Sequence, residues 1–273
     1  MRPYIVVVND DGICSEGLLA AVKGAAAVGD VLVAAPVTQQ TAMGRSYPRI
    51  PDLGIVEEVP DFIQADDAEL GAVKDRVKAY AVHGSPGYCA LFGILELSER
   101  RPDLLVSGIN IGLNAGKCLT TSGTLGAAFE ARSQEVPALA LSLEVEEETV
   151  LEETAGLERF RCASAITEYW VRRVLEEKDG DHPEYQFLNV NIPSGEIGTD
   201  DYRFTFLEDQ NYYVQEPIPK GRDRKEPFVP GWRIRVDEAA LHAGSDIQTV
   251  VQDRLTSVTP LTMDFTRNEK SRF

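Results

Sequence analysis

Near its start the chain reads Ile-Val-Val-Val-Asn-Asp-Asp-Gly over residues 5–12. An unbroken apolar, β-branched run is typical of a strand buried on both faces of a parallel sheet. The carboxyl ends of such strands open on a ligand crevice. Asp10 and Asp11, adjacent at that position, repel each other unless a cation neutralises them. The stretch therefore predicts an α/β protein that holds a divalent metal at a strand end.

The chain that follows alternates helices and strands. Ser15 is positioned to cap a helix, and a strand at 30–35 completes a βαβ unit. Similar patterns predict strands at 80–82, 104–106, 138–143 and 187–192, and helices at 85–100, 125–133 and 156–177. This alternation indicates a doubly wound, mostly parallel sheet.

Near residue 194 the alternation of helices and strands ends, and the sequence pattern becomes that of short strands. Short strands are predicted at 202–207, 212–214, 232–236 and 255–258, and the first two of these are expected to pair as a hairpin. A Pro- and Gly-rich segment with four basic residues occupies 215–232. We therefore predict a metal- and phosphate-binding core at 1–193 and a β-rich C-terminal arm at 194–273 that serves oligomerisation.

Composition and charge narrow the classes of partner. With 43% hydrophobic and 26% charged residues, the 273-residue chain has the composition of a globular protein. Its net charge of −17 argues against binding polymeric DNA or RNA, which requires a basic surface. No apolar run approaches the roughly 18 residues of a membrane span, and no signal peptide is visible. We therefore expect a cytoplasmic protein with no membrane partner, whose four cysteines, lacking any C-x-x-C pair, are reduced thiols.

Polar residues at three predicted strand ends provide the ligands of a metal site. They comprise two carboxylates, a loop hydroxyl and an amide, from Asp10, Asp11, Thr41 and Asn110. These all-oxygen ligands suit Mg²⁺ or Mn²⁺. Ser122-Gly123-Thr124 opens a helix whose free N–H groups suit a phosphate. Each feature alone also fits a turn, a tight loop or a helix cap, and their convergence at strand ends favours phosphate chemistry.

Six short blocks of the sequence form a recognisable series. They are Val8–Gly12, Ala35-Pro36 with Gln40, Gly84–Pro86, Ser107–Asn110, Ser122–Thr124 with Ala127-Ala128, and Ser257–Leu261 with Asp264. Their order and spacing resemble the SurE family of stationary-phase survival proteins over nearly the whole chain. The resemblance implies a Rossmann-like fold with a β-rich C-terminal extension. It also implies a divalent-metal-dependent phosphatase acting on nucleoside 5′- and 3′-monophosphates, assembled as a homodimer or homotetramer.

Carried over position by position, the resemblance assigns two sets of residues. The ligands of one divalent cation per subunit would be Asp10, Asp11, Thr41 and Asn110. The phosphate and substrate surroundings would be Asn9, Gly12, Ser107, Gly108, Ser122, Gly123 and Thr124. The chain departs from the family pattern at Cys14, Thr41, Ala42, Tyr88, Lys117, Cys118 and Thr121. These departures leave the metal core intact and alter its rim, which bears on substrate preference and turnover.

The expected function is phosphomonoester hydrolysis at a single-metal site, with Asp10 or Asp11 orienting or deprotonating the attacking water. A haloacid-dehalogenase-like phosphatase would form an aspartyl-phosphate at an Asp-x-Asp motif, which adjacent aspartates fit poorly. A receiver-like signalling module would need a phosphoacceptor Asp after its third strand and a Lys after its fifth, and the sequence offers neither. A nucleotide-binding protein without hydrolysis stays open as the alternative.

Overall fold

The computed structural model of the chain describes residues 1–63, 70–145, 160–178, 180 and 182–265. Its strands are β1 (Tyr4–Val8), β2 (Asp30–Pro36), β3 (Val56–Glu58), β4 (Val77–Val82), β5 (Leu104–Ile111), β6 (Ala138–Leu143), β7 (Phe187–Ile192), β8 (Tyr202–Phe204), β9 (Tyr213–Gln215), β10 (Trp232–Ile234) and β11 (Thr256–Pro260). Its α-helices are α1 (Glu16–Ala26), α2 (Pro86–Phe92), α3 (Gly123–Ser133), α4 (Arg161–Glu177) and α5 (Asp246–Val251). None of these described helices combines the length and the apolarity that crossing a bilayer would take.

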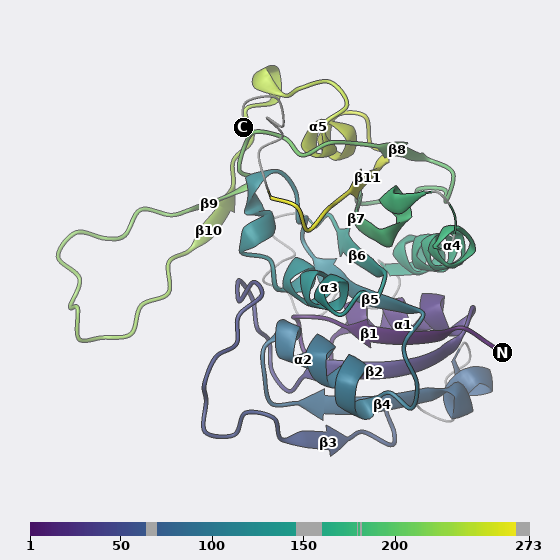
Figure 1. Ribbon diagram of the computed structural model, residues 1–273. Helices are drawn as coiled ribbons and strands as arrows, with labels where there is room; N and C mark the ends of the chain where they lie inside the picture. Colours follow the sequence, from purple (N-terminus) through teal and green to yellow (C-terminus); the bar gives the residue numbers. More distant parts are fainter. Residues whose placement is uncertain (64–69, 146–159, 179, 181, 266–273) are drawn as a thin grey trace, which may run out of the picture.

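Within the described residues, nine strands form one sheet in the order β3-β4-β2-β1-β5-β6-β7-β11-β8 (Figure 1). The run from β4 to β7 is parallel throughout. At the two edges of this run, β3 and β11 pair with it antiparallel, and β8 lies parallel to β11. The predicted doubly wound, mostly parallel sheet is confirmed.

Helices cover both faces of the sheet, which explains the unbroken apolar run in β1. Ile5 and Val7 pack in one core cluster with residues of α1 and α4. Val6 and Val8 point the opposite way and pack with residues of α2 and α3. Because neither face of β1 meets water, the strand has no polar position.

The order of the strands creates a crevice beside β1. From β1 the chain moves outward through β2 to β4, and it then returns to place β5 on the other side of β1. In open α/β sheets, ligands bind at such a switch point, outside the carboxyl ends of the strands. Asp10 and Asp11 follow β1 directly, and Asn110 lies in the last residues of β5.

Two local predictions were wrong in their details. Strand β5 continues to Ile111, so the residues expected to form a loop after Val106 are part of the strand, which shifts register between Ser107 and Asn110. The helix expected over 85–100 is α-helical only to Phe92 and continues as a short π-helix. The helix expected over 156–177 is present as α4 from Arg161 to Glu177, and residues 156–159 lie outside the described part of the chain.

The predicted hairpin between 202–207 and 212–214 was also wrong. β11 pairs with β7, the last strand of the parallel run, and its other edge pairs with β8, so β8 joins the main sheet. β9 pairs instead with β10 as a separate two-stranded ribbon. The long loop between β9 and β10 extends away from the body of the protein (Figure 1).

Candidate functional site

The acidic pair lies at the carboxyl edge of the sheet, directly beyond β1. Asp10 is only 5% exposed, and its Oδ1 accepts a hydrogen bond of 2.8 Å from the Thr124 hydroxyl. Burial, reinforced by the neighbouring Asp11 carboxylate, raises the pKa of Asp10 from its ordinary 3.8 to about 7. The two carboxylates therefore share a site where a cation would be favoured over two uncompensated negative charges.

Asp11 is less buried than Asp10 and spans the crevice. Its Oδ2 accepts a hydrogen bond of 3.4 Å from the backbone N–H of Ile111, at the end of β5. Its Oδ1 accepts a second bond of 3.5 Å from the side-chain amide of Gln39, in the loop after β2. Three strand ends thus meet at this side chain, as the sequence predicted.

The amino end of α3 approaches the Asp10 carboxylate closely. Ser122 caps this helix, its Oγ accepting a hydrogen bond of 3.1 Å from the backbone N–H of Leu125. A Cβ atom at Gly123 would lie 2.7 Å from the Asp10 Cβ and 2.8 Å from its Oδ2, so only glycine permits the approach. The positive end of the helix dipole is therefore directed at the acidic site.

The loop that carries Thr41 is attached at several points to the rest of the site. The backbone N–H of Gln40 donates to the Asp10 carbonyl at 2.7 Å, and that of Gly44 donates to Thr121 at 3.0 Å. Arg45 pairs at 2.8 Å with Glu130, a residue of α3 that is 1% exposed. Sequence reasoning missed this ion pair, because one glutamate in a helix of small residues does not reveal a partner 85 positions away.

Several polar atoms of the site are available to a ligand. The Asn110 amide donates to the carbonyls of Ile111 at 3.3 Å and Gly112 at 2.7 Å, which leaves its Oδ1 as the acceptor atom. The Asn9 Oδ1 and the Ser107 Oγ are buried and have no hydrogen-bond partner in the described residues. Buried polar atoms normally find a partner, so this set fits a hydrated cation and a phosphate.

A pocket of about 250 Å³ gathers much of the predicted site. The predicted residues that line it are Asp10, Asp11, Thr41, Asn110 and Ser122. The predicted residues that do not line it are Asn9, Gly12, Ser107, Gly108, Gly123 and Thr124. The same pocket has an apolar lining that the sequence did not indicate, from Ile111, Leu113, Tyr213 and Trp232.

The donor set is compatible with a weakly coordinated hard cation. In the described part of the chain, no three His, Cys, Asp or Glu side chains converge to hold an ion. A cation at Asp10 and Asp11 would therefore depend on neutral oxygens and on water for its other ligands. Mg²⁺ usually keeps several waters and binds through one or two carboxylates.

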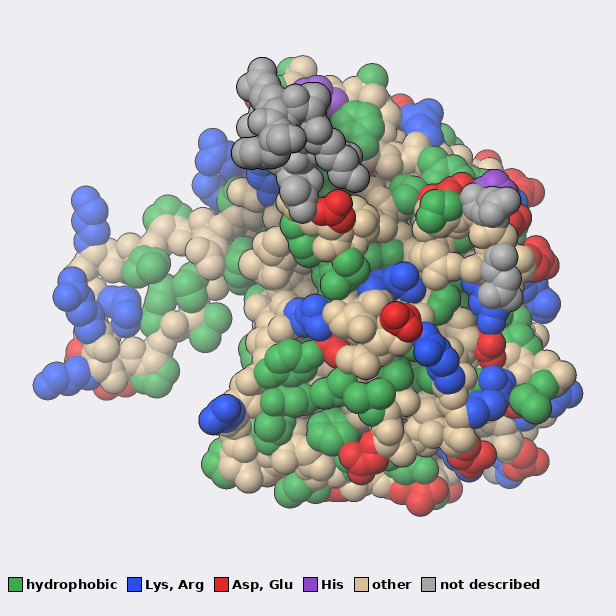
Figure 2. Space-filling view, in the orientation of Figure 1, with side chains coloured by type: hydrophobic (Ala, Val, Ile, Leu, Met, Phe, Trp, Pro, Cys, Tyr) green, Lys and Arg blue, Asp and Glu red, His purple; other side chains and the backbone are tan. Residues whose placement is uncertain are grey.

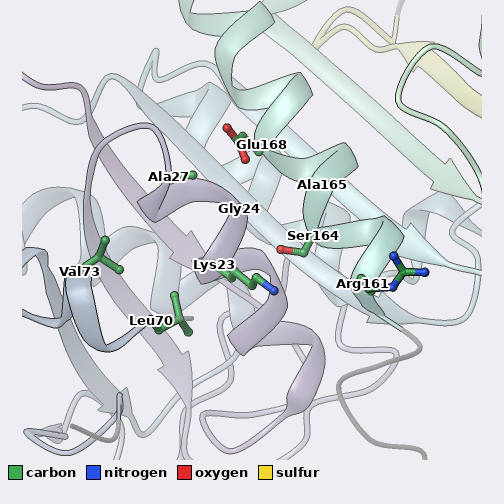
Figure 3. A pocket seen from close by; sticks show the side chains of 9 residues that line it. All are labelled: Lys23, Gly24, Ala27, Leu70, Val73, Arg161, Ser164, Ala165 and Glu168. Carbon is green, nitrogen blue, oxygen red and sulfur yellow. The ribbon is translucent and has the colours of Figure 1, made fainter. Parts of the chain in front are cut away.

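A second hollow, of about 400 Å³, lies between α1 and α4 (Figure 3). Its charged side chains include Glu168, which pairs with Arg172 at 2.8 Å, and Arg161, which pairs with Glu196. These charged groups belong to a helix and form ion pairs at the surface. They are not carboxylates at the ends of strands, where the ligands of an α/β protein bind. We therefore assign the candidate site to the smaller pocket.

The family profile described as "Survival protein SurE" matches residues 5–213 of the chain. The chain belongs to the SurE family. It is 35% identical to a 5′-nucleotidase SurE of Methanocella arvoryzae over 277 aligned residues, covering 99% of this chain and 96% of that protein. It is 36% identical to a 5′-nucleotidase SurE of Methanoculleus marisnigri over 272 residues, covering 97% and 94%.

The crystal structure of the SurE protein from Aquifex aeolicus has the same fold. It superposes with a TM-score of 0.69 at 26% sequence identity, covering 97% of this chain and 95% of that one. The SurE resemblance and the fold class predicted from the sequence are therefore both confirmed.

A buried polar network behind the pocket of this SurE chain was not predicted. Asn189 and Asn191, on the same face of β7, bond the backbone of Asn114 at 2.8 Å through the Asn189 amide and the Asn191 Oδ1. The Asn114 amide donates to the Thr124 hydroxyl at 3.3 Å, and that hydroxyl donates to Asp10. The only signal in the sequence was the alternation of two asparagines in a buried strand.

Proposed function

We propose that this SurE chain is a divalent-cation-dependent phosphomonoesterase that hydrolyses nucleoside 5′-monophosphates, and 3′-monophosphates as well, to nucleoside and phosphate. That the chain is a hydrolase follows from its family, whose matched members are named 5′-nucleotidases. The observation that carries the proposal is the buried Asp10 carboxylate, held beside Asp11 and at the amino end of α3.

The residues divide the work of hydrolysis between them. A bound Mg²⁺ or Mn²⁺ would polarise the phosphate and lower the pKa of water. Asp10 and Asp11 would hold the cation, with neutral oxygens from Thr41 and Asn110. Backbone N–H groups at the start of α3 would hold the phosphoryl oxygens as negative charge develops on them. Asp11, the more exposed carboxylate, is the better placed of the pair to orient the attacking water.

Phosphate release from a panel of nucleoside 5′- and 3′-monophosphates tests this proposal. The purified chain is assayed as isolated, after EDTA treatment, and after Mg²⁺ or Mn²⁺ is added back. We expect chelation to abolish release and the added cation to restore it. Release that chelation leaves unchanged would refute the metal-dependent mechanism. Nucleotide binding without any release would favour the nucleotide-binding alternative.

Assembly into homodimers or homotetramers would use the C-terminal arm at 194–273, and within it the projecting loop at 216–231. Its exposed apolar side chains include Ile218 at 59% and Val229 at 85% exposure. Figure 2 shows Lys and Arg side chains gathered at the far end of the arm, on a chain whose net charge is −17. A basic, apolar projection is complementary to the acidic surface of a second copy.

Sedimentation velocity tests the role of the arm. We expect the full chain to sediment as a dimer or tetramer, and a variant with residues 216–231 of the arm replaced by a short Gly-Ser linker to sediment as a smaller species. Identical sedimentation of the two proteins would show that the arm does not mediate assembly.

A further inference from the structure

The root of the arm reaches into the candidate site. β9 and β10 pair antiparallel, with Ile234 opposite Tyr213 and Trp232 opposite Gln215. Residues two positions apart on a strand share a face, so Tyr213 and Trp232 are diagonal neighbours on one face of this ribbon. Both line the pocket of about 250 Å³ that also contains Asp10 and Asp11.

Tyr213 is held in place from several sides. Its backbone N–H lies 3.4 Å from the Cys118 sulfur, and its carbonyl lies 3.5 Å from the same atom. A Cβ atom at Gly112 would lie 2.4 Å from the Tyr213 hydroxyl, so that hydroxyl rests directly over the backbone at the end of β5. Its ring packs edge-on against Tyr212, with the centroids 4.8 Å apart. This side of the pocket is therefore preorganised.

Trp232 offers a flat apolar surface beside Tyr213. Trp232 is 44% exposed, and its ring takes part in none of the ring contacts found among the described residues. The same pocket is lined by Asp10 and Asp11, whose carboxylates suit a cation. One pocket therefore combines an acidic end, formed by Asp10 and Asp11, with an aromatic end, formed by Tyr213 and Trp232.

We propose that Tyr213 and Trp232 form the base-binding surface of the site and set its specificity for nucleoside monophosphates over other phosphomonoesters. This inference rests on the proposed function. Hydrolysis of a simple phosphate ester makes no use of an aromatic platform, whereas every nucleobase has a π-face that stacks on one. The volume of the pocket, about 250 Å³, is slightly below the roughly 300–1,000 Å³ typical of small-molecule sites, and so leaves room for no more than one nucleotide.

Steady-state kinetics with paired substrates tests the inference. Adenosine 5′-monophosphate and ribose 5-phosphate share the reacting group, and only the first carries a base. We expect Trp232→Ala to raise KM for the nucleotide by roughly 5- to 150-fold, the usual strength of base stacking, and to leave ribose 5-phosphate unaffected. Trp232→Phe should keep most of the affinity. Phe228→Ala, an exposed aromatic of the same arm that does not line the pocket, is the matched control and should behave as the parent.

Tryptophan fluorescence gives a readout that does not depend on catalysis. The chain has two tryptophans, and Trp170 is fully buried in the core. Adenosine without a phosphate should quench the parent protein, and it should leave Trp232→Phe unquenched because Trp170 is shielded.

The outcomes separate the inference from the proposed function. A parent protein that cleaves neither substrate refutes the proposed function, and quenching by adenosine would then still support the base-binding surface. If the parent cleaves both substrates and Trp232→Ala changes both equally, or neither, the inference alone fails. A change of oligomeric state in Trp232→Ala would also overturn it, in favour of an assembly contact.

Discussion

The two ends of the candidate pocket are constructed in different ways. At the acidic end, Asp10 is 5% exposed and is held by groups from α3 and from the loop after β2. At the aromatic end, Trp232 is 44% exposed on a two-stranded ribbon that lies outside the main sheet. The acidic end is built on the main sheet, and the aromatic end is built on a separate two-stranded ribbon.

This difference assigns separate tasks to the two ends. A group buried among several elements has one position, which catalysis requires. The ribbon packs on a small apolar cluster that includes Leu113 and Ile247 and lies outside the main sheet, so it can change in sequence without disturbing that sheet. Substitutions at the acidic end should therefore reduce turnover of every substrate, whereas substitutions at the aromatic end should change which substrate is preferred.

The largest effect is expected when the acidic end loses a charge. Asp10→Asn keeps the shape of the side chain and removes the carboxylate that would bind the cation. We expect kcat to fall by at least about 10³-fold for every phosphomonoester. Asp30→Asn, at the amino end of β2 in the same sheet, is the matched control and should retain full activity. Equal rates in the two variants would contradict a catalytic role for the acidic pair.

A smaller effect is expected when the acidic end is displaced rather than neutralised. Gly123→Ala introduces a Cβ atom 2.7 Å from the Asp10 Cβ, so either the carboxylate or the amino end of α3 must move. Because a displacement of 1 Å can cost about 10²-fold, we expect a loss of that order in kcat/KM. Gly87→Ala, in the first turn of α2, has its nearest neighbour at 3.6 Å and should be neutral. A fully active Gly123→Ala would show that the close approach is dispensable.

The parts of the site that could be predicted are those encoded locally. The apolar run of β1, the aspartates that follow it and the Ser122 cap are each legible within a few residues. Sheet topology then explains why they meet, since the carboxyl ends of parallel strands share one edge. On this basis the sequence predicted a set of oxygen ligands at Asp10, Asp11, Thr41 and Asn110, and these four residues line one pocket.

The parts that could not be predicted depend on pairing over long distances. The Asn114–Asn191 hydrogen bond spans 77 positions, and no local pattern identifies either partner. Strand β8 was assigned to a hairpin because its neighbour in sequence was nearest, yet its actual partner is β11, more than fifty residues further on. The aromatic end of the pocket was missed for the same reason, since β10 is brought to it by pairing with β9.

The polar network behind the acidic end is expected to have a moderate effect. Thr124→Val removes the hydroxyl that donates to Asp10 and preserves the side-chain volume. We expect kcat to fall by about 10- to 100-fold, the usual cost of losing a group that orients a metal ligand. Thr249→Val removes a buried hydroxyl that has no partner in the described residues, and it should leave activity unchanged. An equal loss of activity in Thr124→Val and Thr249→Val would contradict a specific role of the Thr124 hydroxyl in orienting Asp10.

The mildest test of the acidic end is its response to pH. Without a cation, Asp10 has a pKa of about 7 in the folded chain and an ordinary value of 3.8 when unfolded. Between these values the folded state holds a proton that the unfolded state releases, so the contribution of Asp10 to the free energy of unfolding decreases as pH rises. A cation replaces that proton, and its apparent affinity should rise by up to about tenfold per pH unit until about pH 7.

Thermal unfolding in EDTA and in Mg²⁺ measures both effects. We expect the stabilisation by Mg²⁺ to be small near about pH 4 and large near about pH 8. In EDTA, Asp10→Asn should unfold at a higher temperature than the parent at about pH 8, because the variant has no charge to bury. The side chain of Trp232 has no ionisable group, so Trp232→Ala should follow the parent curve. If Mg²⁺ stabilises the parent equally at both pH values, Asp10 is not the group that the cation neutralises.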